Sequence, residues 1–233
     1  PTQYGSTVAI GNVVVSPSEF MPRLFAENGR LLDSQGRITL DTPEALRALE
    51  NYRETYSYSD RTIYDFWKNA LEGFAAMTVV FINYASHILN SQMSRIAGKL
   101  GFAPVPGGKP LLGGGVIGIA QSCTCPAAAC KFLEWLYADL VAPVFTMLGG
   151  LSPCRSAYSN RDISEQYPWL STARKSFPTA QRRSNSTYYQ NFSELQLETI
   201  LAAHVQQAVL GVCSPEEALK QAQEDCNRYF QPW

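Results

Sequence analysis

The stretch from Leu100 to Ala120 constrains the fold of this chain more than any other part, because glycine and proline interrupt its apolar residues at close intervals. It predicts a strand that ends at Pro104 and Pro106, then a glycine-rich passage, and then a second strand over residues 116–120. The stretch supplies no nucleophile, general base or set of metal ligands. We therefore interpret it as part of a hinged ligand cleft, in a protein that binds a molecule without reacting with it.

The composition is that of an ordinary globular protein. The 233 residues are 45% hydrophobic and 17% charged, which is enough apolar material for one large domain or two small ones. A net charge of -1 argues against a nucleic-acid partner and against a basic membrane-binding surface. No apolar run reaches the roughly 18 residues of a membrane span. The chain begins at Pro1 without a signal-like segment, so we expect a processed or cut start.

The cysteine and glycine motifs predict neither a metal nor a cofactor. The cluster Cys123-Thr-Cys125…Cys130 lacks the paired spacing and the fourth ligand of a zinc site, so we expect buried thiols flanking the start of a helix. The six cysteines permit disulfides, but a chain of this length does not need them. Residues Gly113–Gly118 match the spacing of a dinucleotide-binding loop. β-Branched residues follow instead of a helix, which argues against that cofactor.

Helix and strand signals alternate along the chain, which predicts the α/β class. Capping residues and apolar periodicity predict helices that follow Thr42, span 60–71, span Pro126–Leu140, follow Ser193 as far as Gly211, and follow the capping box at Ser214. Gly73 is the expected cap of the second of these helices. The β-rich run Ala76–Ile82 predicts a buried strand.

Several short motifs occur in an order that resembles a known family. They are Pro22–Gly29 with Ile38–Ala45, Gly73–Thr78, Gly101–Ala120, Ala127–Leu136 and Gly149–Tyr158. Together they resemble the extracellular solute-binding proteins of ABC sugar transporters, in the class that includes maltose-binding protein. No single motif is specific, and the resemblance depends on their order and spacing along nearly the whole chain.

The resemblance implies a periplasmic-binding-protein-like fold of type II, with a ligand cleft between two lobes. Members of the family are longer, so the chain resembles their C-terminal portion and lacks part of the first lobe. We expect residues 1–115 to form the central part of the ligand-binding lobe and residues 158–233 to form its C-terminal helical part. Residues 116–157 would cross between the lobes and pack on the missing N-terminal lobe.

The resemblance also implies a function. The protein would bind a small carbohydrate, either a mono- or an oligosaccharide, and deliver it to the permease of a bacterial ABC importer. It would act outside the cytoplasm, in the periplasm or as a cell-surface lipoprotein, and it would not be an enzyme. We also expect self-association through the apolar surface that the missing part leaves uncovered on the helix Pro126–Leu140.

Two alternatives remain open. One is a cytoplasmic sugar-sensing domain of a regulator, because the cysteine-rich character fits a reducing compartment slightly better than the cell surface. The other is a glycosidase, because its two carboxylates need only be near each other in space. Glu27, Asp33, Glu72 and Glu194 are candidates for such a pair.

A sugar site needs aromatic surfaces for the apolar ring faces and hydrogen-bonding groups for the hydroxyls. Phe81, Asn83 and Tyr84 follow the predicted strand, at the end where α/β sheets place ligands. The resemblance puts a stacking aromatic in this segment, with Asn83 nearest to its position. Tyr188 and Tyr189 resemble a second stacking surface of the family.

Glycines and one arginine complete the predicted site. Gly113 and Gly114 would let the backbone approach a ligand, because glycine has no Cβ. Arg155 follows the turn at Gly150, and its guanidinium would bind hydroxyl or carboxylate groups in a fork. We expect Tyr84, Gly114 and Tyr188 to converge on one surface.

Overall fold

The computed structural model describes residues 2–12, 15–61, 66–182 and 185–233, and the chain forms two compact units. Unit 1 comprises residues 1–79, 105–112 and 179–233, and unit 2 comprises residues 80–104 and 113–178. The chain therefore passes between the units at 79/80, 104/105, 112/113 and 178/179. These units divide the chain differently from the predicted segments, because residues 80–104 and 158–178 belong to unit 2.

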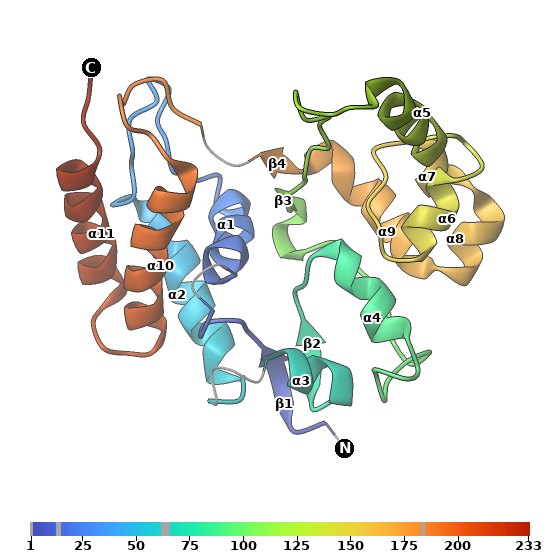
Figure 1. Cartoon of the computed structure of the whole chain (residues 1–233). Helices are drawn as coiled ribbons and strands as arrows, with labels where there is room; N and C mark the ends of the chain where they lie inside the picture. Colours follow the sequence, from blue (N-terminus) through green and yellow to red (C-terminus); the bar gives the residue numbers. More distant parts are fainter. Residues whose placement is uncertain (1, 13–14, 62–65, 183–184) are drawn as a thin grey trace. The chain divides into compact units, whose positions relative to one another are not determined.

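Unit 1 is a group of helices around one apolar core (Figure 1). Its helices are α1 (Ser16–Ala26), α2 (Pro43–Ser57), α3 (Phe66–Glu72), α10 (Glu194–Val209) and α11 (Pro215–Tyr229). Helix α10 packs against α1, α2 and α11, so segments from distant parts of the sequence meet in the core. The largest fully buried side chains of this core include Phe20, Tyr52 and Phe230.

The long helices of unit 1 begin where the capping residues predict. Thr42 and Ser193 each accept a hydrogen bond from the backbone N–H three residues on, at 3.2 and 3.4 Å. Ser214 and Glu217 form both hydrogen bonds of a capping box. Helix α10 ends close to Gly211. These local hydrogen bonds satisfy backbone N–H groups that the first helical turn leaves free, and the three predictions are confirmed.

The helix predicted over residues 60–71 is present in part. The described part of helix α3 runs from Phe66 to Glu72, and the helix ends one residue before the predicted cap at Gly73. Residues 62–65, with the predicted apolar position Ile63, lie outside the described residues.

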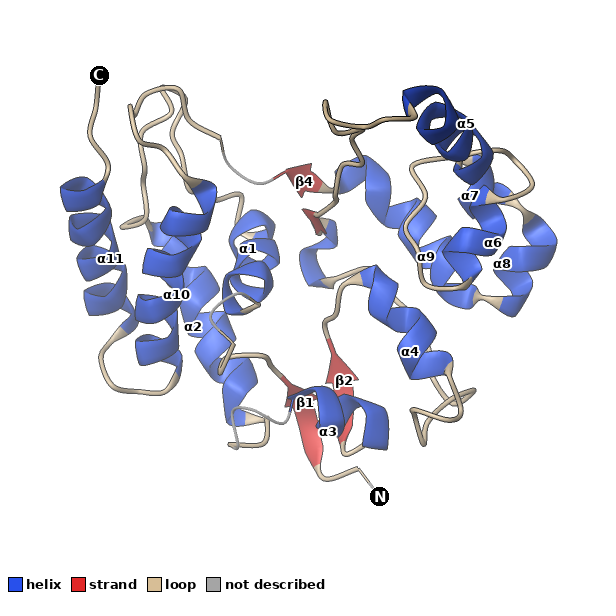
Figure 2. Ribbon diagram, in the orientation of Figure 1, coloured by secondary structure: helices blue, strands red, loops and turns tan. Residues whose placement is uncertain are grey.

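The strands are short and form two parallel pairs (Figure 2). Strand β1 (Tyr4–Thr7) pairs with β2 (Ala75–Thr78), with Tyr4 opposite Ala75 and Thr7 opposite Thr78. Strand β3 (Leu111–Leu112) pairs with β4 (Gln181–Arg182) in the same sense. Helices combined with parallel strands confirm the predicted α/β class.

Of three predicted strands, one is shorter than predicted and two are absent. The buried strand predicted over Ala76–Ile82 is replaced by the shorter β2, in which Met77 is exposed and β1 is the one paired neighbour among the described residues. Residues 100–104 and 116–120, which are all described, form no strand, and Val116 is fully exposed. β-Branched residues favour a strand only where a neighbouring strand supplies hydrogen bonds and side-chain contacts, and the β-branched residues of 79–82 and 116–120 have no such neighbour among the described residues.

Unit 2 consists of short helices around a second, smaller core. The helices are α4 (Ala85–Leu89), α5 (Pro126–Leu136), α6 (Ala142–Met147), α7 (Ser156–Ser159), α8 (Arg161–Gln166) and α9 (Pro168–Ser176). Trp169 and Leu170 of α9 are buried in this core. Tyr158 of α7 is also buried, and its hydroxyl donates to the carbonyl oxygen of Ser152 at 2.9 Å.

Helix α5 buries little of its apolar surface. Of its residues, which are all described, Leu136 alone is buried. Trp135 is 56% exposed, and Phe132 is exposed beside it, with 5.7 Å between the ring centroids. The predicted continuation of this helix to Leu140 is wrong. The chain turns after Leu136, and the next helix starts with Pro143 in its first turn, a position that proline favours over a helix interior.

The six cysteines all lie in described segments and are free thiols. Cys125 and Cys130, near the start of α5, are exposed, so the prediction of buried thiols is wrong for these two. The reason is that this end of α5 is not covered by other described residues. In α11, by contrast, Cys226 is buried, and burial raises the pKa of its thiol to about 12.

Unit 1 buries a carboxyl group at Glu19 of α1. Its oxygens accept hydrogen bonds from the Tyr52 hydroxyl at 2.6 Å and from the backbone N–H of Ala9 at 3.2 Å. Burial raises the pKa of Glu19, and the hydrogen bond from Tyr52 opposes that shift. Because its pKa is higher in the folded state, this group contributes most stability below the unfolded pKa and loses that contribution as the pH rises through the folded pKa.

A helix able to span a lipid bilayer, judged by length and hydropathy, does not occur among the described residues.

Candidate functional site

The predicted site residues fall in both units. Phe81, Asn83, Tyr84, Gly113, Gly114, Gly150 and Arg155 lie in unit 2, whereas Tyr188 and Tyr189 lie in unit 1. The convergence of Tyr84, Gly114 and Tyr188 on one surface therefore stays a prediction.

In unit 2, the segment after β2 forms a short 3-10 helix, Ile82–Tyr84, that runs directly into α4. The carbonyl oxygen of Phe81 accepts a hydrogen bond from the N–H of Tyr84 at 3.0 Å. The carbonyl oxygen of Asn83 accepts a hydrogen bond from the Ser86 hydroxyl at 3.0 Å. These bonds fold the segment into a tight turn in which Phe81, Asn83 and Tyr84 are all partly exposed.

The glycine-rich passage and the turn at residues 149–150 both lie against this segment. A Cβ added to Gly113 would lie 3.8 Å from Cε1 of Phe81. A Cβ added to Gly149 would lie 2.5 Å from the hydroxyl oxygen of Ser86, and the φ of Gly149 is 98°, which residues with a Cβ rarely adopt. Unit 2 thus brings three separate parts of the predicted site into contact.

Gly150 has a packing role. A Cβ at this position would lie 2.4–2.5 Å from three atoms of the Phe145 ring in α6. The Gly150 N–H also donates to the carbonyl oxygen of Phe145 at 3.0 Å. A Cβ at Gly114, by contrast, would meet nothing within 4 Å. Close packing against Phe145 therefore accounts for the glycine at position 150, whereas the backbone at Gly114 is open to a ligand.

The variant Gly150→Ala is expected to lower the free energy of unfolding by about 1–3 kcal/mol, because the added methyl group overlaps the Phe145 ring. Gly114→Ala is the matched control and should stay within about 0.5 kcal/mol of the parent protein. Urea denaturation followed by circular dichroism measures both. Equal unfolding midpoints for the two variants would refute the packing role of Gly150.

Arg155 immediately precedes α7 and is exposed. Its carbonyl oxygen accepts hydrogen bonds from the Tyr158 N–H at 3.0 Å and from the Ser159 hydroxyl at 2.9 Å. Its guanidinium forms no ion pair with the described residues. The backbone of Arg155 thus starts a helix, while contact of its side chain with a ligand stays a prediction.

In unit 1, Tyr189 belongs to the apolar core. It is 8% exposed, and its hydroxyl oxygen accepts a hydrogen bond from the Ile38 N–H at 3.0 Å. Its ring centroid lies 5.7 Å from that of Phe230 and 6.5 Å from that of Phe192. Tyr188 is 37% exposed and lies edge-on to Tyr189, with 4.9 Å between the centroids. Of the predicted pair, Tyr188 offers more of its ring to solvent.

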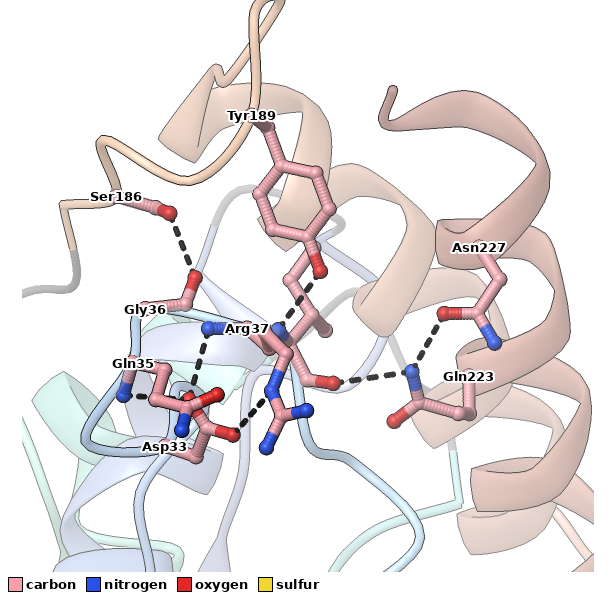
Figure 3. Close-up of polar contacts among 9 residues, drawn as sticks. Asp33, Gln35, Gly36, Arg37, Ser186, Tyr189, Gln223 and Asn227 are labelled. Carbon is pink, nitrogen blue, oxygen red and sulfur yellow. Dashed lines mark hydrogen bonds and ion pairs between the residues drawn. The ribbon is translucent and has the colours of Figure 1, made fainter. Parts of the chain in front are cut away.

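Polar side chains hold the loop around Gly36 against α11 and against the segment before Tyr189 (Figure 3). The Ser186 hydroxyl donates to the carbonyl oxygen of Gly36 at 2.6 Å. Gln223 of α11 donates to the carbonyl oxygen of Ile38 at 3.1 Å and accepts from the N–H of Leu40 at 2.7 Å. One amide side chain therefore satisfies two backbone groups, as a neighbouring strand would.

Asp33 organises the loop itself. Its carboxylate accepts hydrogen bonds from the N–H of Gln35 at 2.8 Å and from the N–H of Arg37 at 2.9 Å. The Nε of Arg37 forms an ion pair with the same carboxylate at 2.7 Å. The backbone N–H of Arg37, followed by the other contacts, holds the pKa of Asp33 below its usual value. Asp33 is thus a charged structural group.

The sequence predicts Asp33 only as one of four candidate carboxylates of a glycosidase, and it does not predict the role of Gln223. The signal for Asp33 is its spacing from Gly36, because aspartate followed closely by glycine is typical of a tight turn. In the structure, Gly36 has the positive φ (81°) that such a turn requires. Gln223 gave no signal, because a polar residue in an amphipathic helix usually faces water.

Metal-ligating side chains are dispersed. Among the described residues, no group of three or more His, Cys, Asp or Glu side chains is arranged to hold a metal ion. His204 of α10 instead pairs with Asp225 of α11, with 2.8 Å between Nε2 and Oδ2. The described part of the chain thus contains no candidate metal centre.

Comparison with known proteins gives the fold a name. No protein-family model matches the chain. It is similar in structure to maltose-bound MalE3 of T. maritima (TM-score 0.76, 20% identity, 97% of this chain and 59% of that chain). It is also similar to the sugar-binding protein MalE of Xanthomonas citri (TM-score 0.76, 16% identity, 98% of this chain and 58% of that chain). A third similar structure is UgpB of Mycobacterium tuberculosis in complex with glycerophosphocholine (TM-score 0.75, 18% identity, 98% of this chain and 58% of that chain).

The chain has a periplasmic-binding-protein-like fold. This confirms the predicted fold class. The chain spans less than two thirds of the length of these structures. The periplasmic-binding-protein-like fold is therefore present in part.

Proposed function

We propose that the chain is part of a solute-binding protein whose two lobes close on a small carbohydrate and present it to an ABC importer. The protein would act outside the cytoplasm of a bacterium, in the periplasm or as a cell-surface lipoprotein. It has no catalytic step, because its work is to hold a ligand in the closed form and release it in the open form.

The observation that carries this proposal is the shared fold over nearly the whole chain. The similar structures include one bound to maltose and one named as a sugar-binding protein. A third holds glycerophosphocholine, another small molecule with free hydroxyl groups. A fold by itself does not determine a ligand, so the local chemistry of unit 2 is the second support.

That chemistry suits a sugar. Phe81 and Tyr84 are partly exposed aromatic residues, and Phe81 lies in contact distance of Gly113. An aromatic ring next to open backbone and a polar amide, here Asn83, matches the apolar faces and hydroxyl groups of a carbohydrate. Gly113 is the first residue, and Phe81 the second, after two of the points where the chain passes between the units, so a hinge motion at these points would move both residues.

Residues 116–157 would pack on a further lobe. This part of unit 2 exposes large apolar side chains, among them Phe132 and Trp135 of α5 and Leu148 after α6. Apolar surface of this kind is normally covered by another part of the protein. The remaining lobe of a longer protein is the proposed cover, and in its absence a second copy of this chain takes that place.

Calorimetric titration with a panel of mono- and oligosaccharides tests the function on the product of the complete gene. At least one sugar is expected to bind, and Phe81→Ala should weaken that binding by about tenfold through loss of an aromatic contact. Tyr58→Ala removes an exposed aromatic residue of unit 1 and is the control. Absence of binding across the panel, or turnover of a chromogenic glycoside, would exclude this function. The isolated chain should bind weakly or not at all.

A second candidate is a cytoplasmic sugar-sensing domain of a regulator. The observation that favours it is the set of free thiols, because Cys125 and Cys130 are exposed and exposed free thiols suit a reducing compartment. The segments encoded on either side of this chain separate the two candidates. A lipoprotein signal supports transport, whereas a DNA-binding helix pair supports sensing.

A further inference from the structure

Unit 1 carries a surface hollow that is open to solvent. Its volume is about 440 Å³, within the usual range for small-molecule sites. The loop that contains Asp33 and Arg37, the segment at Tyr188 and the helix α11 with Asn227 contribute its lining. We call it the Arg37 hollow. All of its lining residues belong to unit 1, and two of them, Tyr188 and Tyr189, are among the predicted site residues.

The floor of the Arg37 hollow is apolar and fixed. Ile38, Tyr189 and Phe230 line it, and all three are buried in the core of unit 1. The Tyr189 hydroxyl is already occupied by the Ile38 N–H. A ligand therefore meets a surface that does not need to rearrange, which lowers the entropic cost of binding.

The rim carries polar groups whose positions are also fixed. The Nε of Arg37 is held by Asp33, which leaves the other guanidinium nitrogens as donors (Figure 3). The Oδ1 of Asn227 accepts a hydrogen bond from the Nε2 of Gln223 at 2.9 Å, which leaves the Asn227 NH2 group as a donor. Hydrogen bonds within the protein thus orient two sets of donors before any ligand arrives.

The charge of the rim favours a neutral ligand. Arg37 would attract an anion, but the Asp33 carboxylate lies 2.7 Å from its Nε and compensates its charge. The lowered pKa of Asp33 keeps this pair ionised at neutral pH. Hydroxyl groups suit such a rim, because each can accept from the guanidinium or amide and also donate to a carboxylate oxygen.

Tyr188 supplies the aromatic part of the hollow. Its ring is packed edge-on to Tyr189 and remains partly exposed. A partly exposed aromatic ring beside fixed donors and a carboxylate is the combination that recognises the apolar face and the hydroxyls of a sugar ring. We infer that the Arg37 hollow is a second carbohydrate site, for one neutral sugar residue, carried by unit 1 alone.

The test is an NMR titration of the ¹⁵N-labelled chain with methyl α-D-glucoside. Saturable shifts are expected at the Asn227 side-chain NH2 and the Arg37 Nε–H, with a dissociation constant of about 1–10 mM because few groups are engaged. Arg37→Met keeps the aliphatic stem and should weaken binding by about fivefold or more. Tyr188→Ala removes the ring and should weaken binding similarly without disturbing Arg37. Arg53→Met, at an exposed arginine of α2, is the control and should change nothing.

Three results would overturn the inference. One is the absence of shifts at Asn227 and Arg37 up to about 100 mM glucoside. Another is tighter binding of methyl glucuronide, because an anion should gain nothing at a compensated pair. The third is loss of the Asn227 response in Phe81→Ala, which would assign the binding to unit 2. The proposed transport function stands or falls separately, since it depends on binding that Phe81→Ala weakens and Arg37→Met leaves unchanged.

Discussion

Replacing Phe230 with alanine is expected to lower the free energy of unfolding of unit 1 by about 3–5 kcal/mol. Phe230 is 1% exposed, and its ring lies 5.7 Å from the rings of both Tyr189 and Phe192. It follows the last turn of α11 and belongs to the same core as α1 and α2. Alanine would leave a cavity at the point where the C-terminal helix meets the rest of the unit, and urea denaturation measures the cost.

The neighbouring residue provides the control. Tyr229 is 45% exposed, although its ring lies 5.0 Å from that of Phe230. Tyr229→Ala removes a ring of nearly the same size from the same end of α11, and it should cost less than about 1 kcal/mol. If both variants lost the same stability, the effect would belong to the helix end and not to the buried ring. Phe230→Ala should also broaden the Asn227 resonances, because Phe230 lines the Arg37 hollow.

The second large effect concerns self-association. We expect the chain alone to associate at high concentration through the exposed face of α5, where Phe132 and Trp135 lie next to each other. The double variant Phe132→Ser/Trp135→Ser should raise the dissociation constant by about 100-fold or more, since large aromatic residues dominate the energy of such interfaces. Sedimentation velocity at several concentrations measures this constant.

Tyr58→Ser controls for the removal of an exposed aromatic residue elsewhere, because Tyr58 lies in unit 1 and is 60% exposed. It should leave the association unchanged. A parent chain that sediments as a monomer at about 1 mM would contradict the prediction. An association that persists unchanged in the double variant would assign it to another surface.

The parts of the fold that the sequence predicts well are those with a local cause. The capping box of α11 joins Ser214 to Glu217, three residues away, so both partners are visible in one short motif. The strands have no such local cause. β1 and β2 are stabilised by pairing between Tyr4 and Ala75, residues far apart in sequence, and the β-rich run around Met77 does not reveal how much of it finds a partner.

The candidate site shows the same division. The motifs predict the segments at Phe81, at the glycine-rich passage and at the 149–150 turn, and unit 2 brings these segments into contact. The motifs do not distinguish Gly150, which packs on Phe145, from Gly114, which faces open space. They do not predict the burial of Tyr189 either, because that burial depends on Phe230 at the far end of α11. Burial and packing arise from contacts between distant segments, and a single sequence does not contain that information.

The two cores become complete at different times during translation. The segments of unit 2 all lie between residues 80 and 178, so its core can assemble while the ribosome is still adding the remainder. The core of unit 1 forms later, because α1 and α2 pack with α10 and α11, which are synthesised more than a hundred residues after them. Until then the apolar faces of α1 and α2 stay open to water, and a nascent chain at this stage is a natural substrate for a chaperone.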